Sequence, residues 1–441
     1  MTTFDQNTTY VFIAGKNWKL SLAEIISYLN ARSCTFRVVE VSKPFFLIET
    51  EKPLGTTIID DLGGTVKIGK TVTSISTKAV TDAFIHRNKQ SRMEVQAALS
   101  ENPNINGIFR TSPPKLVFGV SVYSGHSRFI RFSREIHRFF GGVLKEILTA
   151  KGVRSSFMGF PRHRQLPQLS HVEVLKKRLV EDSAEILFCI GERKTFVART
   201  LAVHDPFEFQ KRDIGRPVQR KIFSIPPRLA KIMVNLASCL PGMVLLDPFC
   251  GVGAILQEAM LNGAQVIGMD IDSWCAKAAE KNLEWVKSEY KLEQDFPKVL
   301  VGDSRHLSNY ILRESVDCIV TEPDLGPPLR HLPTESHAGI LVRELMPLYD
   351  NFLESAYETI KRNSSLVLVT PYFRARSGTF VSVNLDQKTT SLGFKKVNFF
   401  REISPVNNVT LWKELEENSG SFVDIAERQI VGREIHVFCK I

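Results

Sequence analysis

The most constraining feature of this chain is a short apolar run that ends on an acid and passes into a glycine turn. Val244–Asp247 is followed by the turn Pro248–Gly253 and by helical apolar spacing from Ala254 to Met260. This order predicts a strand, a loop and a helix, and the loop backbone is open to a ligand because glycine has no Cβ. A second apolar run, Gln265–Met269, ends on Asp270. An acid at that strand end is placed to accept hydrogen bonds from ribose hydroxyls.

The loop Asp247-Pro248-Phe249-Cys250-Gly251-Val252-Gly253 lacks the G-x-G-x-x-G pattern of dinucleotide-binding proteins. It resembles motif I of the Rossmann-like S-adenosylmethionine (SAM) methyltransferases, in the D-P-F-x-G-x-G form of nucleic-acid amino-methyltransferases. The resemblance implies SAM as the cofactor, with its ribose bound by Asp270 and its adenine amino group by Asp303. Asp272 is a second candidate for the ribose, and an N-cap is the structural alternative for Asp303. The cofactor residues expected are Asp247, Phe249, Gly251, Gly253, Asp270, Ile271, Asp303 and Ser304.

Charge is unevenly distributed along the 441 residues, whose net charge is +10. Residues 1–222 contain 34 lysines and arginines against 20 acids, whereas residues 223–441 contain 23 against 27. A basic half joined to a mildly acidic half predicts a polyanion-binding part attached to a separate part that carries the protein's other activity. The alternative is a basic surface that only keeps the protein solvated.

Three further features limit the class of protein. No apolar run approaches the ~20 residues of a membrane span, and Met1–Tyr10 lacks the basic and apolar regions of a signal peptide. The seven cysteines are scattered and contain no C-x-x-C pair, which indicates a reducing cytoplasm rather than a disulfide framework or a zinc site. The ten histidines form no H-x-x-x-H pair. We therefore expect a cytoplasmic protein without a metal ion and without contact with a membrane.

The N-terminal segment has a small α+β pattern. Residues 10–50 predict strand, helix, strand and strand, with Ser21 as the N-cap of a helix over Leu20–Leu29. The run L-G-G-T-V-K-I follows at Leu62–Ile68. This layout resembles the ferredoxin-like domain that precedes THUMP domains in archaeal tRNA guanine-N2 methyltransferases.

The next segment carries the densest positive charge. A strand at Lys115–Tyr123, a basic helix over Arg128–Lys151 and the pattern L-S-x-x-x-V-x-x-x-x-L from Leu169 lead to a strand that begins Glu185-Ile186-Leu187. This order resembles a THUMP domain, an RNA-binding module that grips tRNA acceptor ends. Lysine and arginine suit phosphates because affinity for a polyanion comes largely from counterion release. The residues expected to contact tRNA are Arg131, Arg134, Arg138, Lys176, Lys177, Arg212 and Arg216.

The C-terminal half predicts an α/β domain. From Val244 strands and helices alternate, which predicts a parallel sheet with helices on both faces. A final antiparallel pair is expected in Phe394–Phe400 and Glu434–Phe438. The fold class is therefore α/β, a C-terminal Rossmann-like SAM methyltransferase domain with N-terminal ferredoxin-like and THUMP (α+β) domains. The expected boundaries are 1–95 for the ferredoxin-like domain, 96–200 for the THUMP domain, 201–222 for a charged linker and 223–441 for the methyltransferase domain.

The catalytic motif is expected after the fourth strand of this domain, where the chain reads Glu322-Pro323-Asp324-Leu325-Gly326. The family pattern is Asp/Asn-Pro-Pro-Tyr/Phe. Glu322 therefore takes the first place, Asp324 replaces the second proline, and Leu325 replaces the aromatic residue. The resemblance implies that Glu322, Pro323, Asp324 and Leu325 form the catalytic segment, with Glu322 accepting a hydrogen bond from an exocyclic amine. The ring that stacks on the flipped base is missing, unless it is supplied by Phe249, Tyr372 or Phe373.

Together these features predict a THUMP-class tRNA methyltransferase. It would transfer a methyl group from SAM to the exocyclic N2 of a guanosine, with position 10 as the expected target. Two alternatives stay open: an amino-methyltransferase acting on another RNA base or on DNA, and a non-catalytic RNA-binding protein with a degenerate methyltransferase domain. The retained Asp247, Asp270 and Asp303 argue against the second alternative. The sequence does not determine whether an activating protein subunit takes part.

Overall fold

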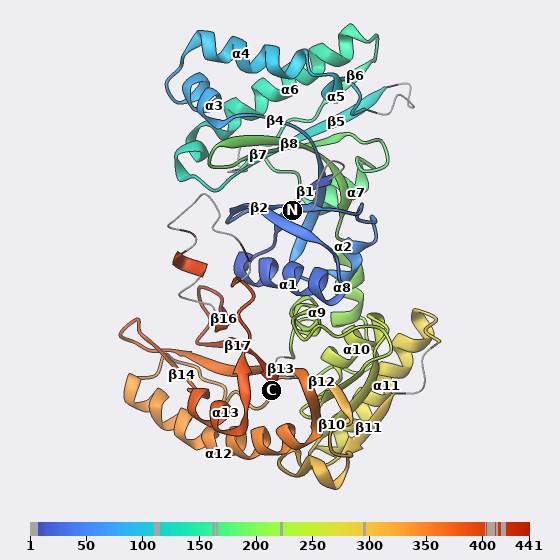
Figure 1. Cartoon of the computed structure of the whole chain (residues 1–441), viewed down its shortest axis with the longest axis vertical. Coiled ribbons are helices and arrows are strands. Elements are labelled where there is room, and N and C mark those ends of the chain that lie inside the picture. Colours follow the sequence, from blue (N-terminus) through green and yellow to red (C-terminus); the bar gives the residue numbers. More distant parts are fainter. Residues whose placement is uncertain are drawn as a thin grey trace. The chain divides into compact units, whose positions relative to one another are not determined.

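The computed structural model describes residues 8–109, 115–160, 164, 166–220, 224–293, 297–401, 403, 411, 413–415 and 420–441 (Figure 1). The chain forms two compact units. Unit 1 consists of Met1–Leu22, Cys34–Pro206 and Glu402–Glu414, and unit 2 consists of Ala23–Ser33, Phe207–Arg401 and Leu415–Ile441. Each unit contains one large β-sheet.

Unit 1 is built on a continuous sheet in the strand order β2-β3-β1-β4-β8-β7-β5-β6. Its central strand β4 pairs antiparallel with β1 on one side and with β8 on the other. The two α+β segments expected from the sequence therefore share one sheet. Its strands are β1 (Thr8–Ala14), β2 (Phe36–Ser42), β3 (Phe45–Thr50), β4 (Thr65–Ser76), β5 (Leu116–Ser124), β6 (Ser155–Phe157), β7 (Glu185–Ile190) and β8 (Lys194–Val203).

Helices α3, α4 and α6 cover one face of this sheet (Figure 1). The core between helices and sheet contains Phe84, Phe140 and Phe188, and the last two rings stack with their centroids 3.7 Å apart. The helices of this half of the chain are α1 (Trp18–Ala31), α2 (Ile58–Asp61), α3 (Thr77–Phe84), α4 (Lys89–Ser100), α5 (Pro103–Asn106), the 3₁₀ turn η1 (Ser127–Phe132), α6 (Ser133–Ala150) and α7 (His171–Lys176).

Two local expectations for this half were wrong. Ser21 is not an N-cap, because it lies inside α1, where its Oγ donates to Asn17 O at 2.9 Å and to Gly64 O at 2.8 Å. The predicted basic helix over 128–151 is divided into η1 and α6, and the Ser133 hydroxyl donates to Ile130 O at the junction. The predicted charged linker at 201–222 contains a helix, α8 (Pro206–Ile214).

The sheet of unit 2 has the main path β11-β10-β9-β12-β13-β17-β15, with β14 paired to β13 and β16 paired to β17. The strands from β11 to β13 are parallel, and β17 is antiparallel to β13 and β15. The predicted parallel sheet and its closing antiparallel pair are thus confirmed. The strands are β9 (Val244–Asp247), β10 (Gln265–Asp270), β11 (Lys298–Val301), β12 (Val316–Thr321), β13 (Ile360–Arg374), β14 (Phe380–Ser382), β15 (Phe394–Lys396), β16 (Ser421–Asp424) and β17 (Val431–Lys440).

Helices cover both faces of this sheet, as the alternating pattern predicts (Figure 1). On one face α12 contributes Tyr349, Phe352 and Leu353 to a core with Leu246 and Ile319. The helix expected after β11 is a 3₁₀ turn, η2, whose interior breaks at a non-helical residue, His306. The helices are α8, α9 (Pro227–Leu236), α10 (Ala254–Leu261), α11 (Ser273–Glu289), η2 (Ser304–Asn309), α12 (Glu335–Thr359) and α13 (Asp386–Leu392).

Within the described ranges, the helices are all too short or too polar to cross a membrane.

A buried ion pair lies in the middle of the unit 1 sheet. Lys67 on β4 and Glu185 on β7 are both almost completely buried and bind each other. Lys67 Nζ also donates to Leu169 O at 2.8 Å, while Glu185 accepts from the Ser121 and Thr200 hydroxyls at 2.7 and 2.8 Å. Lys67 comes from the L-G-G-T-V-K-I run and Glu185 from the E-I-L strand, so the pair connects the two segments on which the sequence resemblance rests.

Removing one member of this pair leaves an uncompensated buried charge. We expect Lys67→Met to lower the free energy of unfolding by about 3–5 kcal/mol, measured by chemical denaturation followed by circular dichroism. The exposed neighbour Lys70 gives the matched control, Lys70→Met, which should change stability little. The double variant Lys67→Met/Glu185→Gln should recover part of the loss, and a single variant as stable as the parent protein would contradict the role assigned to the pair.

Candidate functional site

Polar side chains meet at the carboxyl ends of neighbouring parallel strands in unit 2. β9 ends at Asp247, β10 ends at Asp270, and β12 ends at Thr321, one residue before Glu322. β9 lies between β10 and β12. After β9 the chain adds β10 and β11 on one side of that strand, and it then crosses over to add β12 on the other side. Open α/β sheets bind ligands at the carboxyl edge of such a switch point.

Asp247 is the buried centre of this edge. Its side chain is 1% exposed, and its Oδ1 accepts from Thr321 Oγ1 at 2.7 Å and from the Phe249 backbone N–H at 3.2 Å. Burial raises the pKa of the Asp247 carboxyl to about 7, although the hydrogen bonds from Thr321 and Phe249 act in the opposite direction. The negative charges of Asp270 and Glu322 raise the pKa further. Asp247 thus connects β9, β12 and the glycine loop, and it exchanges its proton near neutral pH.

Asp270 fixes the glycine loop from the next strand. Its Oδ2 accepts from the Gly251 N–H and its Oδ1 from the Asp272 N–H, both at 2.9 Å. Gly251 and Gly253 have φ angles of +51° and +88°, which disfavour any residue with a Cβ. A Cβ on Gly251 would meet no atom closer than Arg220 Nη1 at 4.0 Å, so the loop backbone is open to a ligand at this point.

The alternative carboxylate, Asp272, has a structural role. It is the N-cap of α11 and accepts from the Trp274 N–H at 2.8 Å. Among the expected cofactor residues, the side chain of Ile271 is 71% exposed and that of Ser304 is buried. The structure therefore places an apolar side chain in solvent directly beside Asp270, where it is available to a flat apolar surface such as a purine ring.

Asp303 fits the N-cap role that the sequence left open. It caps η2 and accepts from the Arg305 N–H at 3.0 Å. The Arg305 guanidinium also binds both carboxylate oxygens, through Nε at 3.0 Å and Nη2 at 2.5 Å. These hydrogen bonds from Arg305 lower the pKa of Asp303. Contact with an adenine amino group would therefore require Asp303 to share or exchange this partner, which the sequence did not indicate.

The predicted catalytic segment is bound by an ion pair that the sequence did not reveal. Arg433 on β17 binds Glu322 through both ends of its guanidinium, with Nη2 3.1 Å from Oε1 and Nε against Oε2. The two side chains are only 11% and 15% exposed. Arg433 lies 111 residues from Glu322 in the chain, so only the β13–β17 pairing brings it to the site. The Glu322 carboxylate is held in one orientation.

The remaining residues of the segment shape its backbone. Pro323 is buried and Leu325 is half-buried, whereas Asp324 is exposed. Asp324 Oδ1 accepts from the Gly326 N–H at 3.0 Å, and Asp324 O accepts from the Tyr349 hydroxyl at 2.9 Å. Asp324 therefore forms a turn rather than facing Glu322 with a free carboxylate.

The three aromatic residues considered as stacking partners have different environments. Phe373 is fully buried, and Phe249 packs edge-on against Phe352 with the ring centroids 5.3 Å apart. Tyr372 is half-buried and stacks on Phe380 at 4.7 Å, and Phe380 is 41% exposed. Tyr372 and Phe380 thus form the most accessible of these aromatic surfaces.

In unit 1, most of the expected RNA-contact residues are at the surface. Arg131, Arg138, Lys176 and Lys177 are exposed. Arg134 is half-buried and donates to Arg164 O, and Arg164 in turn binds Glu173 of α7 at 2.9 and 3.0 Å. The basic helix α6 is therefore connected to α7, which carries Lys176 and Lys177.

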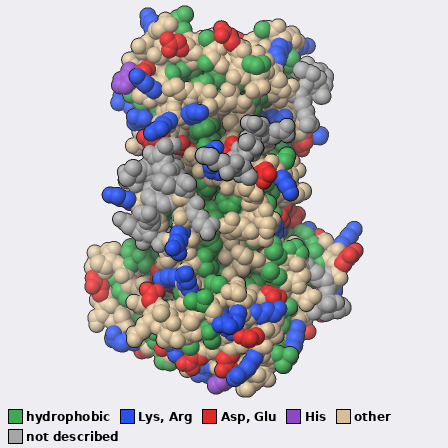
Figure 2. Space-filling model, viewed as in Figure 1, with side chains coloured by type: hydrophobic (Ala, Val, Ile, Leu, Met, Phe, Trp, Pro, Cys, Tyr) green, Lys and Arg blue, Asp and Glu red, His purple; other side chains and the backbone are tan. Residues whose placement is uncertain are grey.

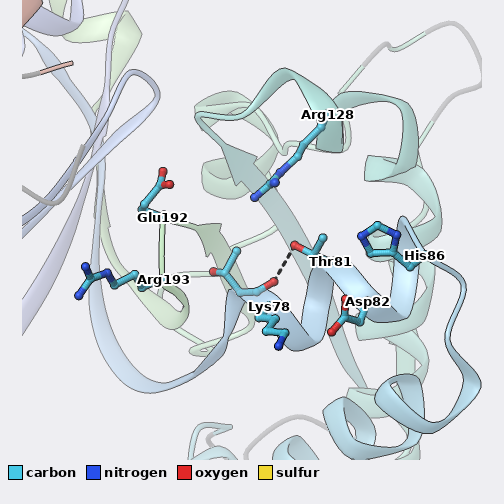
Figure 3. Close-up of a pocket in the computed structure, with 8 residues that line it drawn as sticks. Lys78, Thr81, Asp82, His86, Arg128, Glu192 and Arg193 are labelled. Carbon is cyan, nitrogen blue, oxygen red and sulfur yellow. Dashed lines mark hydrogen bonds between the residues drawn. The ribbon is translucent and has the colours of Figure 1, made fainter. Parts of the chain in front are cut away.

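A pocket of about 510 Å³ adjoins this region (Figure 3). Lys78, His86, Arg128 and Arg193 contribute basic side chains to its lining. The acids Asp82 and Glu192 also line it, and Glu192 lies 3.2 Å from His126. In Figure 3 the Arg128 side chain extends from η1 toward the helix that carries Lys78 and Thr81.

Two of the expected RNA-contact residues do not fit that expectation, because they are buried. Arg212 and Arg216 are each 4% exposed. Arg212 Nε binds Glu258 of α10 at 2.6 Å, and Lys231 reaches the same carboxylate at 3.4 Å. Arg216 Nη2 donates to Ser224 Oγ at 2.8 Å. Arg212 holds α10, the helix that follows the glycine loop, and therefore supports the site from inside the protein.

The described residues contain no group of three or more histidine, cysteine, aspartate or glutamate side chains arranged to hold a metal ion.

Comparisons with known proteins agree on unit 2. Residues 216–390, which lie within unit 2, match the family model described as RMKL-like, methyltransferase domain. The tRNA (guanine(10)-N2)-dimethyltransferase of Methanocaldococcus jannaschii is 35% identical over 202 residues, 44% of this chain and 52% of that protein. The protein of the same name from Methanothermobacter thermautotrophicus is 36% identical over 180 residues, 40% of this chain and 47% of that protein. The matched region thus spans about half the length of these relatives.

One solved structure has the fold of the whole chain. TrmN from Thermus thermophilus superposes with a TM-score of 0.50 at 18% identity, covering 98% of this chain and 100% of that one. At this level of identity the likeness concerns the fold. It confirms the expected fold class, in which an N-terminal α+β part precedes a Rossmann-like α/β domain.

The raised pKa of Asp247 predicts a pH-dependent stability. Between about pH 4 and pH 7 the folded protein keeps a proton that the unfolded chain has released, so the free energy of unfolding falls as the pH rises through this window. Asp247→Asn keeps Oδ1 as the acceptor for Thr321 and Phe249 but carries no charge. Relative to the parent protein, we expect this variant to gain roughly 2–4 kcal/mol between pH 5 and pH 8, measured by denaturant unfolding at both pH values. An equal stability difference at the two pH values would contradict the burial of a titrating carboxyl.

Proposed function

We propose that this protein is a SAM-dependent tRNA methyltransferase of the cytoplasm that methylates the exocyclic N2 of a guanosine, with position 10 as the expected target. The observation that carries the proposal is the match of residues 216–390 to the RMKL-like methyltransferase model, in a region where two parallel strands end at Asp247 and Asp270 and a third ends one residue before Glu322, at a switch point. The names of the relatives from M. jannaschii and M. thermautotrophicus supply the nucleotide and the atom.

The residues at the carboxyl edge fit SAM. Asp270 is half-buried at the end of β10 and is oriented by two backbone N–H groups, so its oxygens can accept from ribose hydroxyls. The backbone at Gly251 is open, and Ile271 is exposed beside Asp270. When bound, SAM supplies an electrophilic methyl group on its sulfonium sulfur.

The catalytic segment has to hold an amine in line with that methyl group. Glu322 can accept one amine hydrogen, and Arg433 fixes the position of its carboxylate. The backbone carbonyls around Pro323 offer further acceptors. Methyl transfer of this kind depends on positioning more than on proton transfer. Glu322 is one methylene longer than the aspartate of the family pattern, and this extra length is compatible with activity if the loop that carries Glu322 lies correspondingly farther from the amine. We also propose that the predicted linker at residues 201–222 separates the catalytic part from the RNA-binding part, within which the predicted ferredoxin-like and THUMP domains meet at residue 95.

RNA contact by unit 1 rests on its charge. Arg131, Arg138, Lys176 and Lys177 are exposed, and Figure 2 shows lysine and arginine side chains across the surface of that unit in this view. The alternative of a non-catalytic RNA-binding protein is supported by the replaced proline and aromatic residue of the catalytic segment. A methylation assay decides between the two.

The first test is single-turnover methylation of unmodified tRNA with labelled SAM, followed by mass spectrometry of the nucleosides. The parent protein should form N2-methylguanosine or N2,N2-dimethylguanosine. Glu322→Ala should reduce the rate at least ~100-fold, the effect of misplacing a reacting group, and should bind SAM and tRNA as before. Glu322→Gln, which preserves packing against Arg433, should also be impaired.

Asp324→Asn is the control for this test, because its amide oxygen can still accept from Gly326 while the neighbouring charge is removed. It should retain most of the activity. Full activity of Glu322→Ala would remove Glu322 from the catalytic role, whereas a parent protein that binds tRNA but methylates none would favour the binding-protein alternative.

The second test concerns the cofactor. Asp270→Ala should weaken SAM binding by roughly 1.5–3 kcal/mol, the range for a hydrogen bond to a charged group, measured by calorimetry. Asp272→Ala serves as the control, because it removes a nearby carboxylate that caps α11, and it should keep nearly the parent affinity. Unchanged SAM affinity in a folded Asp270→Ala protein would exclude Asp270 from the cofactor site.

A further inference from the structure

A pocket of about 580 Å³ lies in unit 2 near the catalytic segment. Three pieces of chain line it: residues 330–332 of the loop that follows Glu322–Leu325, the end of β13 with the residues after it, and the turn between β16 and β17. Together they contribute four arginines and one histidine, and Glu427 is the only carboxylate among the described lining residues. We call Arg330, Arg374, Arg376 and Arg428 the arginine pocket.

Two of these arginines build the walls of the pocket. The guanidinium of Arg374 donates to the backbone carbonyls of Glu427 and Ala426, and the Arg374 N–H donates to Ile430 O at 2.9 Å. The Arg376 Nε donates to Leu332 O at 2.8 Å. These bonds connect the end of β13 to the other two pieces of chain, so the pocket has a fixed frame.

The other two arginines face solvent. Arg330 and Arg428 are exposed, and in the described part of the chain neither side chain has a hydrogen bond or an ion pair. Like charges gathered in one pocket repel one another, and an anion removes that repulsion. Arginine is suited to phosphate in particular, because its planar fork donates two parallel hydrogen bonds to a phosphate group.

The pocket lies at the end of β13, and β13 pairs with the strand that holds the partner of Glu322. Tyr372 of β13 lies opposite Gly432 of β17, and the next residue of β17, Arg433, binds Glu322. The exposed Phe380 ring stacks on Tyr372, and the Arg374 guanidinium lies 5.6 Å from the centroid of the Phe380 ring. A basic pocket with an accessible aromatic pair beside it is the combination that binds single-stranded nucleic acid, with phosphates on the arginines and bases on the rings.

We propose that the arginine pocket binds the phosphodiester groups of the RNA strand that flanks the target nucleotide. The proposal rests on the proposed function, because it assumes that the substrate of the catalytic segment is an RNA. A nucleotide whose base reaches Glu322 brings its neighbouring phosphates along the same edge of the sheet. The catalytic unit therefore holds the substrate locally, in addition to the basic surface of unit 1.

The test uses the full chain with the double substitution Arg330→Gln/Arg428→Gln, which removes the two exposed arginines and leaves the wall residues intact. At physiological salt, the Kd for tRNA should rise about tenfold, and the slope of log Kd against log salt should fall by about 1.5, the amount expected for two phosphate contacts. The KM for tRNA should rise, kcat should change little, and the affinity for SAM should stay the same. Arg330→Lys/Arg428→Lys should restore most of the salt slope.

The matched control is Arg362→Gln, which removes an exposed charge from the other end of β13 and should leave tRNA binding within about twofold, since a distant charge is screened. Equal tRNA affinity and salt slope in the parent protein and the double variant would overturn the proposal while leaving the proposed function intact. A second outcome would also overturn the proposal: inorganic phosphate protects the parent protein but not the double variant against thermal unfolding, while the two proteins bind tRNA equally well. That outcome would identify a site for free anions. A parent protein that binds no tRNA would overturn the proposed function as well.

Discussion

The site depends on one buried carboxyl group, that of Asp247. It lies at the end of β9, where the strand order of the sheet reverses. It accepts hydrogen bonds from Thr321 on β12 and from the backbone of Phe249. The strand that leads into the glycine loop and the strand that leads to Glu322 are thereby joined through one oxygen atom. Because burial keeps the pKa of Asp247 near neutral, this junction does not add a permanent negative charge beside Asp270 and Glu322.

The acids around this junction are all oriented by the protein before a ligand arrives. Asp270 is held by two backbone N–H groups, Asp303 by Arg305, and Glu322 by Arg433. Such fixed groups need little reorganisation when substrates bind, which is the main way a protein accelerates a reaction that depends on positioning. The same bonds explain why retained acids alone are weak evidence for catalysis, because each of them also has a structural task.

The sequence predicted well what is encoded locally. Apolar periodicity and glycine placement are properties of short segments, so the strands that end at Asp247 and Asp270 and the closing antiparallel pair were found. The partners of Glu322 and Lys67 were not, because Arg433 and Glu185 lie 111 and 118 residues away in the chain. For the same reason Arg212 was read as an RNA ligand, although its carboxylate partner Glu258 buries it. The predicted domain boundaries and ligand contacts stay predictions.

The net charge of each half of the chain describes that half as a whole and does not locate individual binding sites. Residues 223–441 carry 23 basic and 27 acidic residues, which suggested a catalytic part without affinity for a polyanion. An ionic ligand responds to charges within about 8 Å at physiological ionic strength, so it responds to the four arginines gathered in one pocket rather than to the sum over the unit. Those arginines come from three separate pieces of chain, and only the folded sheet brings them together near Glu322, the acid proposed to hold the reacting amine. The division into an RNA-binding half and a catalytic half therefore describes average charge only. The contacts that position a substrate can lie in both halves of the chain.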